Sequence, residues 1–576
     1  MLVIRRNNLL LGFYRAVLAP AARPARAMVR IAVVRDITNR LQARSAQRSW
    51  KRCYSARVTG KEPQPPIRSV ADLKAWLPGA SVPLVEVCGW VRSVRKSSGV
   101  RFIDITDGSS MRPVQVVVEK SLAADIRPGT AVRLKGAWYN TVGKNGDGAG
   151  ASANSHAASA EARSPINDGE DTRTSQPTQE LKVHQVEILG SSDPHTLPIQ
   201  NKYQTPESLR NVPHLRFRTP LNSTVLRLRS DTMASLTRFF ANEQFYQTHP
   251  PIITSSDCEG AGEAFAVKAG PNTEFFRDPK YLTVSAQLHL EAMAQAIGSV
   301  WTLSPTFRAE QSDTSRHLSE FYMLEAEMSF VKNLEEIMAL VQKMLRSLAQ
   351  DLSQLSAASE LRQNRLDSRD PAEKLAFADL AEGEVLRRRW AGLQSQRKWP
   401  RITYSQAIEH LQTVAERFDH PPAWGSSLQS EHEKYLAEVL GYDEQEDAYL
   451  PIFVTQYPRQ IKAFYMLGSA SSPAEGETVD CFDLLVPDIG ELAGGSMREN
   501  RLSELESSMQ LHGLEVPGKR DAGKNSLGWY VDLRRWGCPP HGGFGLGFDR
   551  LLSYLSGFSN VRDVVPFPRH FQRCDC

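Results

Sequence analysis

Two segments near the middle of the chain, Phe307-Arg308-Ala309-Glu310 and Arg316-His317-Leu318-Ser319-Glu320-Phe321, have the pattern of a charged β-hairpin. An arginine and a carboxylate two residues apart on a strand point to the same side, and the polar loop between the segments carries another arginine. Such a hairpin can grip a nucleotide, with Arg308 on a phosphate and Phe321 stacked on the base. A surface hairpin with ion pairs is the alternative, and it explains the charges but not their arrangement.

A glycine-rich segment near the C-terminus, Gly543-Phe544-Gly545-Leu546-Gly547-Phe548-Asp549-Arg550, leads into the helical pattern LLSYLSG. The G-x-G-x-G spacing alone is weak evidence of a nucleotide site, because Phe548 stands where the dinucleotide fingerprint has its third glycine. Glycines that feed an arginine-bearing helix nevertheless allow a nucleotide to approach the backbone closely.

Two carboxylates, Asp483 and Glu491, lie close together in the chain, and Glu491 opens the segment that ends at Arg498. Their oxygen atoms can share a Mg²⁺ ion, although a pair of carboxylates can also act as a general acid and a general base. A further segment, Tyr281–Glu291, has the pattern of a strand that runs into a helix, with Gln287 near the junction.

The flanking pattern predicts an N-terminal β-barrel at residues 83–190. Five strands in about 110 residues suit a small barrel of the OB type, although other five-stranded β modules share this pattern. An insertion at 143–179 is rich in Gly, Ala, Ser, Asn and Asp and should be disordered. Apolar and polar residues alternate in the five segments 84–95, 100–108, 112–120, 131–139 and 181–189.

The C-terminal part of the chain has the pattern of an α+β domain at 219–576. Residues 191–218 resemble a linker, and residues 219–243 then have helical spacing that stops before His249-Pro250-Pro251. Strands alternate with helices from there onward, and a charged helical stretch at about 333–399 resembles an insertion that packs on the core. We expect an antiparallel sheet flanked by helices.

The N-terminus carries the positive charge of the chain. Residues 1–62 hold twelve Arg and two Lys against two acidic residues, a net charge of +12, which leaves −8 for the rest of a chain of net charge +4. An arginine-rich, acid-poor leader is typical of a mitochondrial transit peptide, although a basic RNA-binding arm is also arginine-rich. Arg52-Cys53-Tyr54-Ser55 resembles a processing-protease site. We predict a transit peptide at 1–54, an N-terminal extension at 55–82, and a mature protein in the mitochondrial matrix.

Cysteine spacing and hydropathy argue against other classes of protein. The seven cysteines include no C-x-x-C pair, which disfavours both a disulfide framework and a zinc site. Cys574 and Cys576 at the C-terminus can chelate an ion, but a frayed tail is the simpler reading. No apolar run reaches the ~18 residues of a membrane span, so we expect no membrane association.

In combination, these motifs resemble those of the class II aminoacyl-tRNA synthetases. The charged hairpin resembles motif 2, the glycine-rich segment resembles motif 3, and the helix that ends in Thr248-His249-Pro250-Pro251 resembles motif 1, with Pro250 at its dimer-interface position. The similarity covers about residues 83–570 apart from the two insertions, and class I signatures are absent. An OB barrel before the catalytic core is the plan of the subgroup for Asp, Asn and Lys.

Within this subgroup the chain resembles the asparaginyl enzymes. In LTVSAQLHLEA, Leu290 stands where aspartyl enzymes have a lysine that helps to neutralise the substrate carboxylate. Glu325 stands where aspartyl enzymes have Asp, and the resemblance implies that it accepts a hydrogen bond from the asparagine amide and repels aspartate. Arg498 would donate to the side-chain oxygen. Ala286, His289 and Met497 depart from the family pattern, and Met497 is expected to loosen the edge of the pocket.

The resemblance implies that ATP and Mg²⁺ activate L-asparagine to asparaginyl-adenylate, and that a homodimer then transfers the asparaginyl group to tRNA(Asn). Phe102 would help to read the anticodon, although a place in the barrel core is the alternative. The implied site residues are Arg308, Glu310 and Arg550 for catalysis; these three with His317, Phe321, Glu491 and Gly547 for ATP; Asp483 and Glu491 for Mg²⁺; Glu259, Gln287, Glu325 and Arg498 for the amino acid; and Phe102 and Gln115 for the anticodon.

Three rival functions stay open. An aspartate–tRNA ligase shares nearly all of these motifs, so the choice rests on a few pocket positions. A synthetase-like asparagine synthetase uses the same adenylate chemistry, but such paralogues lack the anticodon barrel. A non-catalytic RNA-binding paralogue is disfavoured, because Arg308, Glu310, Glu491 and Arg550 are all present.

Overall fold

The computed structural model describes residues 67–76, 81–141, 178–200, 202–255, 264–270, 275–367, 380–514, 516 and 527–576. The transit peptide predicted at 1–54, nearly all of the insertion predicted at 143–179, and Glu259 lie outside these residues. Within the described part of the chain, no helix combines the length and the apolar character that a membrane crossing needs.

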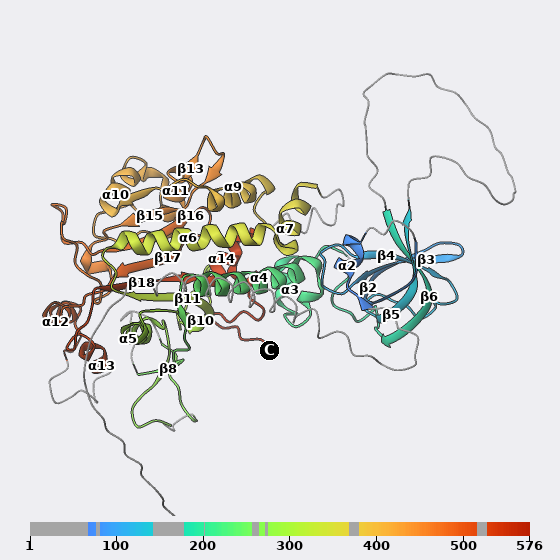
Figure 1. Cartoon of the computed structure of the whole chain (residues 1–576), viewed down its shortest axis with the longest axis horizontal. Coiled ribbons are helices and arrows are strands. Elements are labelled where there is room, and N and C mark those ends of the chain that lie inside the picture. Colours follow the sequence, from blue (N-terminus) through green and yellow to red (C-terminus); the bar gives the residue numbers. More distant parts are fainter. Residues whose placement is uncertain are drawn as a thin grey trace, which may run out of the picture. The chain divides into compact units, whose positions relative to one another are not determined.

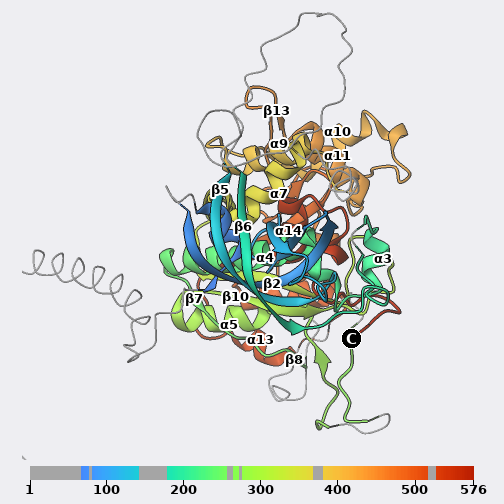
Figure 2. The same ribbon diagram turned by 90° about the vertical axis from the view of Figure 1, so that its right-hand side faces the viewer.

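Five strands close into a barrel, as the alternating pattern predicted (Figure 2). Strand β2 pairs with both β3 and β5, which closes the sheet, and β4 runs parallel to β6. Fully buried aliphatic side chains such as Val87, Ile103 and Leu134 fill the interior. The strands are β2 (Val82–Lys96), β3 (Val100–Thr106), β4 (Val114–Glu119), β5 (Ala131–Thr141) and β6 (Thr178–Gly190), with the short β1 (Ile67–Arg68) beside β2.

A short helix, α2 (Val70–Ala75), covers part of the barrel core. Ser69 begins it as the N-cap, and its hydroxyl accepts the backbone N–H of Asp72 at 3.0 Å. Such a cap stabilises a helix by about 1 kcal/mol. Val70 and Leu73 of this helix are fully buried among the aliphatic side chains of the barrel.

An eight-stranded sheet organises the C-terminal domain (Figure 1). The inner pairs are antiparallel, as predicted, and a parallel pair stands at each edge, β12–β15 and β10–β7. In sheet order the strands are β12 (Arg401–Thr403), β15 (Ile452–Thr455), β16 (Cys481–Val486), β17 (Gly490–Met497), β18 (His541–Gly547), β11 (Glu320–Ser329), β10 (Ser299–Phe307) and β7 (Tyr246–Gln247).

Helices cover one face of this sheet and form the main apolar core. α6 contributes a stripe that includes Ile337, Val341, Leu345, Leu348 and Leu352, all at most 2% exposed. Each such buried side chain stabilises the fold by about 1.5–3 kcal/mol, so α6 is firmly packed on the core. The helices on this face are α4 (Pro220–Asn242), α6 (Leu334–Ser353), α7 (Ser356–Asp367), α9 (Gly383–Gln394) and α14 (Phe548–Ser556).

Helices also pack on the opposite face of the sheet, both beside β10 and at the β15–β16 end. α5 (Gln287–Ile297) packs there through Leu290 and Ala294, against Val300 of β10 (Figure 1). The junction predicted near Gln287 is therefore the start of this helix, after β9 (Tyr281–Leu282). Smaller elements are α3 (Pro206–Arg210), β8 (Ile253–Thr254), α10 (Tyr404–Gln412), α11 (Ser430–Val439), β13 (Tyr442–Asp443), β14 (Ala448–Tyr449), α12 (Leu502–Leu511) and α13 (Gly528–Asp532).

Candidate active site

Strand alternation separates the apolar core from a polar face of the sheet. On β11, Leu324 and Ala326 enter the main core, so Met323, Glu325 and Glu327 point to the other face. On β18, the core-facing residues are Phe544 and Leu546. The glycines that alternate with them, Gly543, Gly545 and Gly547, lie opposite Glu327, Glu325 and Met323 in the antiparallel ladder.

These glycines give the side chains of β11 their room. A Cβ atom on Gly543 would lie 2.2 Å from the carbonyl oxygen of Ala326 and 2.3 Å from Cδ of Glu327. A Cβ atom on Gly545 would lie 2.9 Å from the methyl group of Met323. The G-x-G-x-G spacing therefore serves close packing on the polar face of the sheet.

A cavity of about 140 Å³ lies above this face, where the charged hairpin meets the start of α14. It brings together Arg308, Glu310, His317, Phe321, Glu491, Gly547 and Arg550, all of which the sequence assigned to one nucleotide site. Arg316, Leu318, Met323, Leu492, Gly545, Asp549 and Val561 complete its lining.

The hairpin wall of the cavity combines a cation with an aromatic ring. The guanidinium carbon of Arg308 lies 5.7 Å from the ring centre of Phe321. His317 Nε2 lies 3.4 Å from Glu310, and its Nδ1 bonds the hydroxyls of Ser312 and Thr314 at 2.9 and 2.6 Å. Burial lowers the pKa of His317, which favours the neutral imidazole.

Helix α14 provides the facing wall. It begins after Gly547, and its first turn carries Arg550, whose Nη1 donates to the backbone oxygen of Glu491 at 2.9 Å and lies 3.5 Å from its carboxylate. Asp549 anchors this turn, because its carboxylate pairs with Arg229 of α4 at 2.5 Å and accepts the backbone N–H of Tyr322 at 2.9 Å.

Carboxylates gather beside Arg550. Asp483 and Glu491 both face Gly494, where a Cβ atom would lie 3.2 Å from Asp483 Oδ1 and 3.3 Å from Glu491 Oε1. Asp483 pairs with Lys462 at 2.7 Å, and Glu433 of α11 pairs with Arg316 at 3.1 Å. Within the described residues, no group of three or more His, Cys, Asp and Glu side chains has the arrangement of a complete metal site.

The charges in this cluster are balanced by partly buried cations. Burial would raise the pKa of Glu491, but Arg550 and Lys462 outweigh it, so that this pKa lies below its usual value. Burial, together with the charge of Glu491, raises the pKa of Glu433 to about 6 and also raises that of Asp483. Of Asp483, Glu433 and Glu491, Glu491 is therefore the carboxylate most firmly held as an anion.

Glu325 lies deeper on the same face, 3% exposed. Its carboxylate accepts the hydroxyl of Ser285, and the backbone N–H of Ala286 at 2.9 Å, at the start of α5. Burial raises the pKa of Glu325, and these two hydrogen bonds oppose that shift. Gln287, expected in the amino-acid pocket, donates to Glu291 at 3.1 Å.

Arg498 is held by a second glutamate that sequence reasoning missed. Its Nη2 donates to Glu327, its Nη1 donates to the hydroxyl of Ser496 at 2.6 Å, and its Nε lies 3.9 Å from Glu291. Arg498 and both glutamates are at most 3% exposed. Glu327 follows Glu325 by two residues on one strand, which is a local signal that both carboxylates share a face.

Glu291 is the centre of a further buried network that the sequence did not reveal. It accepts from Arg534 at 2.7 Å and from the Tyr530 hydroxyl at 2.9 Å, and His541 Nε2 lies 3.0 Å away. These partners are 239 to 250 residues from Glu291 in the chain. No local pattern encodes such pairings.

The two residues predicted to read the anticodon both lie in the barrel. Phe102 is absent from the packed barrel core, which Ile103 and Ile105 enter from the same strand, so it lies on the outer face. Gln115, on the adjacent β4, accepts from Arg95 at 2.5 Å and donates to Glu180 at 2.9 Å.

Pro250 and Met497, two further positions singled out in the sequence, are both buried. Pro250 is buried shortly after β7. Met497 is 2% exposed and belongs to the main core, on the face away from the polar residues. The expectation that it loosens the edge of the pocket was therefore wrong, because its side chain points into the core.

Comparison with known proteins identifies the class of protein. A family described as tRNA synthetases class II (D, K and N) matches residues 205–571, and one described as an OB-fold nucleic acid binding domain matches residues 85–150. The chain therefore belongs to the class II tRNA synthetases, which confirms the predicted family and the OB-type barrel.

Individual relatives narrow this class. The chain is 38% identical over 498 residues to the mitochondrial asparagine–tRNA ligase of Schizosaccharomyces pombe, a match that covers 84% of this chain and 94% of the relative. It is 40% identical over 509 residues to the asparagine–tRNA ligase of Nostoc sp., covering 85% and 96%. The structure of asparaginyl-tRNA synthetase from Pyrococcus horikoshii complexed with asparaginyl-adenylate is 26% identical with a TM-score of 0.66, covering 85% and 95%. Within the class, the protein is a member of the asparagine–tRNA ligases.

Proposed function

We propose that this enzyme activates L-asparagine with ATP and transfers the asparaginyl group to tRNA(Asn) in the mitochondrial matrix. The observation that carries the proposal is the shared face of the sheet. Gly545 lines the nucleotide cavity and lies directly opposite Glu325, so the nucleotide and amino-acid ends of the site adjoin. The relatives named as asparagine–tRNA ligases support the choice of amino acid.

Adenylate formation joins a carboxylate oxygen of asparagine to the α-phosphorus of ATP and releases pyrophosphate. No protein nucleophile is needed, so positioning and charge stabilisation supply most of the catalysis. Arg308 and Arg550 line the cavity from the hairpin and from α14, and in our proposal they hold the α- and γ-phosphates. Phe321 offers its ring to the adenine, while Glu310 and His317 contact the base or its surroundings.

The carboxylates beside Arg550 fit a Mg²⁺ ion that accompanies ATP. Carboxylate oxygens are the ligands that Mg²⁺ prefers, and the missing Cβ of Gly494 leaves a space that Asp483 and Glu491 both face. Asp483 and Glu491 would hold the ion, which would neutralise phosphate charge. Lys462 lies 2.7 Å from Asp483 and balances part of the charge of this carboxylate.

Selection of asparagine over aspartate follows from hydrogen-bond polarity, because the two amino acids have nearly the same shape. Glu325 would accept from the amide N–H of asparagine and repel a carboxylate. Arg498 would donate to the side-chain oxygen that both amino acids possess. A site built around such hydrogen bonds discriminates against an amino acid that cannot form them by a factor of ~10⁴–10⁵.

The barrel would bind the anticodon. Phe102 and Gln115 lie on its outer face, on the adjacent strands β3 and β4. Aromatic side chains on OB barrels stack unpaired bases, and each stack is worth about 1–3 kcal/mol. The bonds from Arg95 and to Glu180 fix the orientation of the Gln115 amide, which suits base-edge recognition.

A homodimer would form at the edge of the catalytic sheet. β7 is the terminal strand, and exposed apolar residues precede and follow the buried Pro250 in the chain. Tyr246 is 60% exposed, Ile253 43% and Ile252 39%. Exposed apolar side chains that lie this close together in the chain suit an interaction site, and a second copy of the chain would cover them.

Import into mitochondria rests on the leader and on the relatives. The net charge of +12 within residues 1–62 favours a transit peptide, and the Schizosaccharomyces pombe relative is a mitochondrial enzyme. A reporter fused to residues 1–54 should enter the organelle; a reporter that stays in the cytosol would remove this part of the proposal.

Pyrophosphate exchange tests the proposed activity. The purified mature protein should exchange labelled pyrophosphate into ATP with asparagine, and aspartate should support exchange more weakly by orders of magnitude. Aminoacylation of a tRNA(Asn) transcript then tests transfer. Exchange that prefers aspartate would replace the proposal with an aspartate–tRNA ligase.

A further inference from the structure

The loop between β3 and β4, residues 107–113, joins the two strands that carry Phe102 and Gln115. Helix α2 holds one side of this loop, because Asp107 accepts the backbone N–H of Val70 and Ser109 accepts that of Ala71, both at 2.9 Å. These two hydrogen bonds tie the loop between the strands to α2.

The other side of the loop enters the catalytic domain. Met111 is 6% exposed and belongs to the apolar core of that domain, whereas its neighbours in the barrel strands belong to the barrel core. Glu360 of α7 accepts the backbone N–H of Met111 and the hydroxyl of Ser110, each at 3.0 Å. One carboxylate thus receives two donors from the hairpin.

Glu360 also connects the hairpin to α4. Its Oε2 pairs with Arg227 of α4 at 2.6 Å, and both side chains are 21% exposed. Two residues further along α4, Arg229 pairs with Asp549, which precedes Arg550 in the nucleotide cavity. Both ion pairs belong to α4, so this helix joins the anticodon hairpin to the start of α14.

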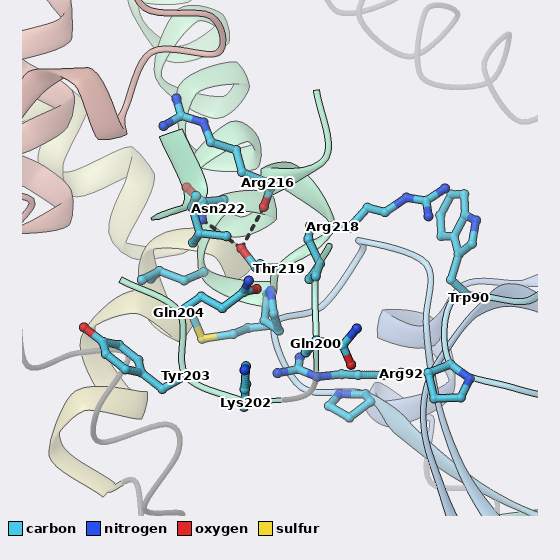
Figure 3. Close-up of a pocket in the computed structure, with 18 of the residues that line it drawn as sticks. Trp90, Arg92, Gln200, Lys202, Tyr203, Gln204, Arg216, Arg218, Thr219 and Asn222 are labelled. Carbon is cyan, nitrogen blue, oxygen red and sulfur yellow. Dashed lines mark hydrogen bonds between the residues drawn. The ribbon is translucent and has the colours of Figure 1, made fainter. Parts of the chain in front are cut away.

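The surroundings of this contact are loosely filled. A cavity of about 320 Å³ lies between the barrel, the linker and the start of α4 (Figure 3). Met111 is among its lining residues. Arg218 reaches across to the barrel there, with its guanidinium carbon 5.7 Å from the ring centre of Trp90 (Figure 3). Because Trp90 is 42% exposed, that contact is weaker than the charge-assisted bonds to Glu360.

We propose that Glu360 is a positioning residue that couples anticodon recognition by the β3–β4 hairpin to aminoacyl transfer. The inference rests on the proposed function, since it requires the barrel to bind the anticodon of tRNA(Asn). Glu360 touches neither the nucleotide cavity nor the amino-acid end, so activation of asparagine in the absence of tRNA does not depend on it.

The test compares Glu360→Gln with the parent in the mature protein. The glutamine side chain has the same shape as that of glutamate. The Glu360 carboxylate accepts hydrogen bonds from three donors, whereas the glutamine amide has only one acceptor oxygen. Pyrophosphate exchange with asparagine should stay within twofold of the parent. The kcat for aminoacylation of tRNA(Asn) should fall about tenfold, within the usual range of coupling between sites, while the KM for tRNA changes less.

A second readout separates coupling from a general loss of structure. When an anticodon base of the tRNA is changed, the kcat of the parent for aminoacylation should fall strongly. The kcat of Glu360→Gln should fall much less, because the coupling between the anticodon and the active site is already lost in this variant. Ser110→Ala removes one of the donors and should give a smaller effect that is not additive with Glu360→Gln. Glu384→Gln on α9, an exposed carboxylate paired with Arg387, is the matched control and should behave as the parent.

Two results would overturn the inference. One is unchanged aminoacylation and unchanged anticodon dependence in Glu360→Gln; the other is a parallel loss of exchange and aminoacylation, which would show a structural role. Failure of the parent to charge tRNA(Asn) would instead overturn the proposed function. If neither a changed anticodon nor the Phe102→Ala substitution lowered the kcat for aminoacylation, the assignment of the barrel to the anticodon would be overturned.

Discussion

The carboxylate of Glu325 accepts the backbone N–H of Ala286 at 2.9 Å, so this acid is held at the N-terminus of α5. The start of a helix carries partial positive charge and stabilises an anion. This interaction opposes the burial that raises the pKa of Glu325. The helix start therefore offsets part of the cost of burying the charge that is proposed to select asparagine.

Replacing Glu325 by Gln should weaken activation of asparagine. The neutral amide loses a charged hydrogen bond of about 1.5–3 kcal/mol to the substrate, and it no longer repels aspartate. The ratio of kcat/KM for asparagine to that for aspartate should fall, as measured by pyrophosphate exchange. An unchanged ratio would place discrimination at other residues.

Replacing Arg498 by Lys should reduce exchange with both amino acids by about 10- to 100-fold, from the loss of one charged hydrogen bond. Lysine keeps a cation beside Glu327 and Glu291 but lacks the planar fork. Arg498→Ala should abolish exchange and also lower the melting temperature, because removing one partner of a buried pair costs about 3–5 kcal/mol. Normal use of aspartate by Arg498→Lys would refute the role of Arg498.

Replacing Gly543 by Ala should destabilise the catalytic domain by about 1–3 kcal/mol, the usual effect of overpacking. The added methyl group would meet the backbone of Ala326 and the side chain of Glu327. Gly99→Ala is the control, because nothing lies within 4 Å of the position its Cβ would take. Thermal unfolding should show a lower melting temperature for Gly543→Ala alone, and equal values would contradict the close packing.

Stability should fall at alkaline pH through His541. Burial lowers its pKa, but hydrogen bonds to Cys538 and Glu291 outweigh this and raise it to about 9. Because folding raises this pKa, protonated His541 contributes up to about 3 kcal/mol to the free energy of unfolding. This contribution is complete below pH ~6.5 and disappears as the pH passes 9.

Urea unfolding between pH 7 and 10 measures this effect. The parent should lose stability across that range, and His541→Gln, which cannot carry the charge, should start lower and show a flatter profile. Parallel profiles for the two proteins would show that His541 is not protonated in the fold.

Local sequence patterns predicted the elements that depend on local physics. Alternating side chains gave the barrel strands, because each residue faces either the core or the outside. The charged hairpin has the expected form, with Thr306 opposite Phe321 in the ladder. The helix expected at 219–243 is α4, which differs by one residue at each end.

The rest depends on contacts between distant segments. Glu327 and Arg498 are 171 residues apart, and Lys462 reaches Asp483 from a separate loop. No spacing rule selects these partners. The barrel–catalytic contact at Glu360 was hidden for the same reason, since Ser110 is 250 residues away.

The most direct test of the account is pyrophosphate exchange by the purified mature protein, with asparagine and aspartate measured in parallel. The account predicts rapid exchange with asparagine and a kcat/KM for aspartate lower by ~10⁴ or more. Equal or greater exchange with aspartate, or no exchange with either amino acid, would contradict it.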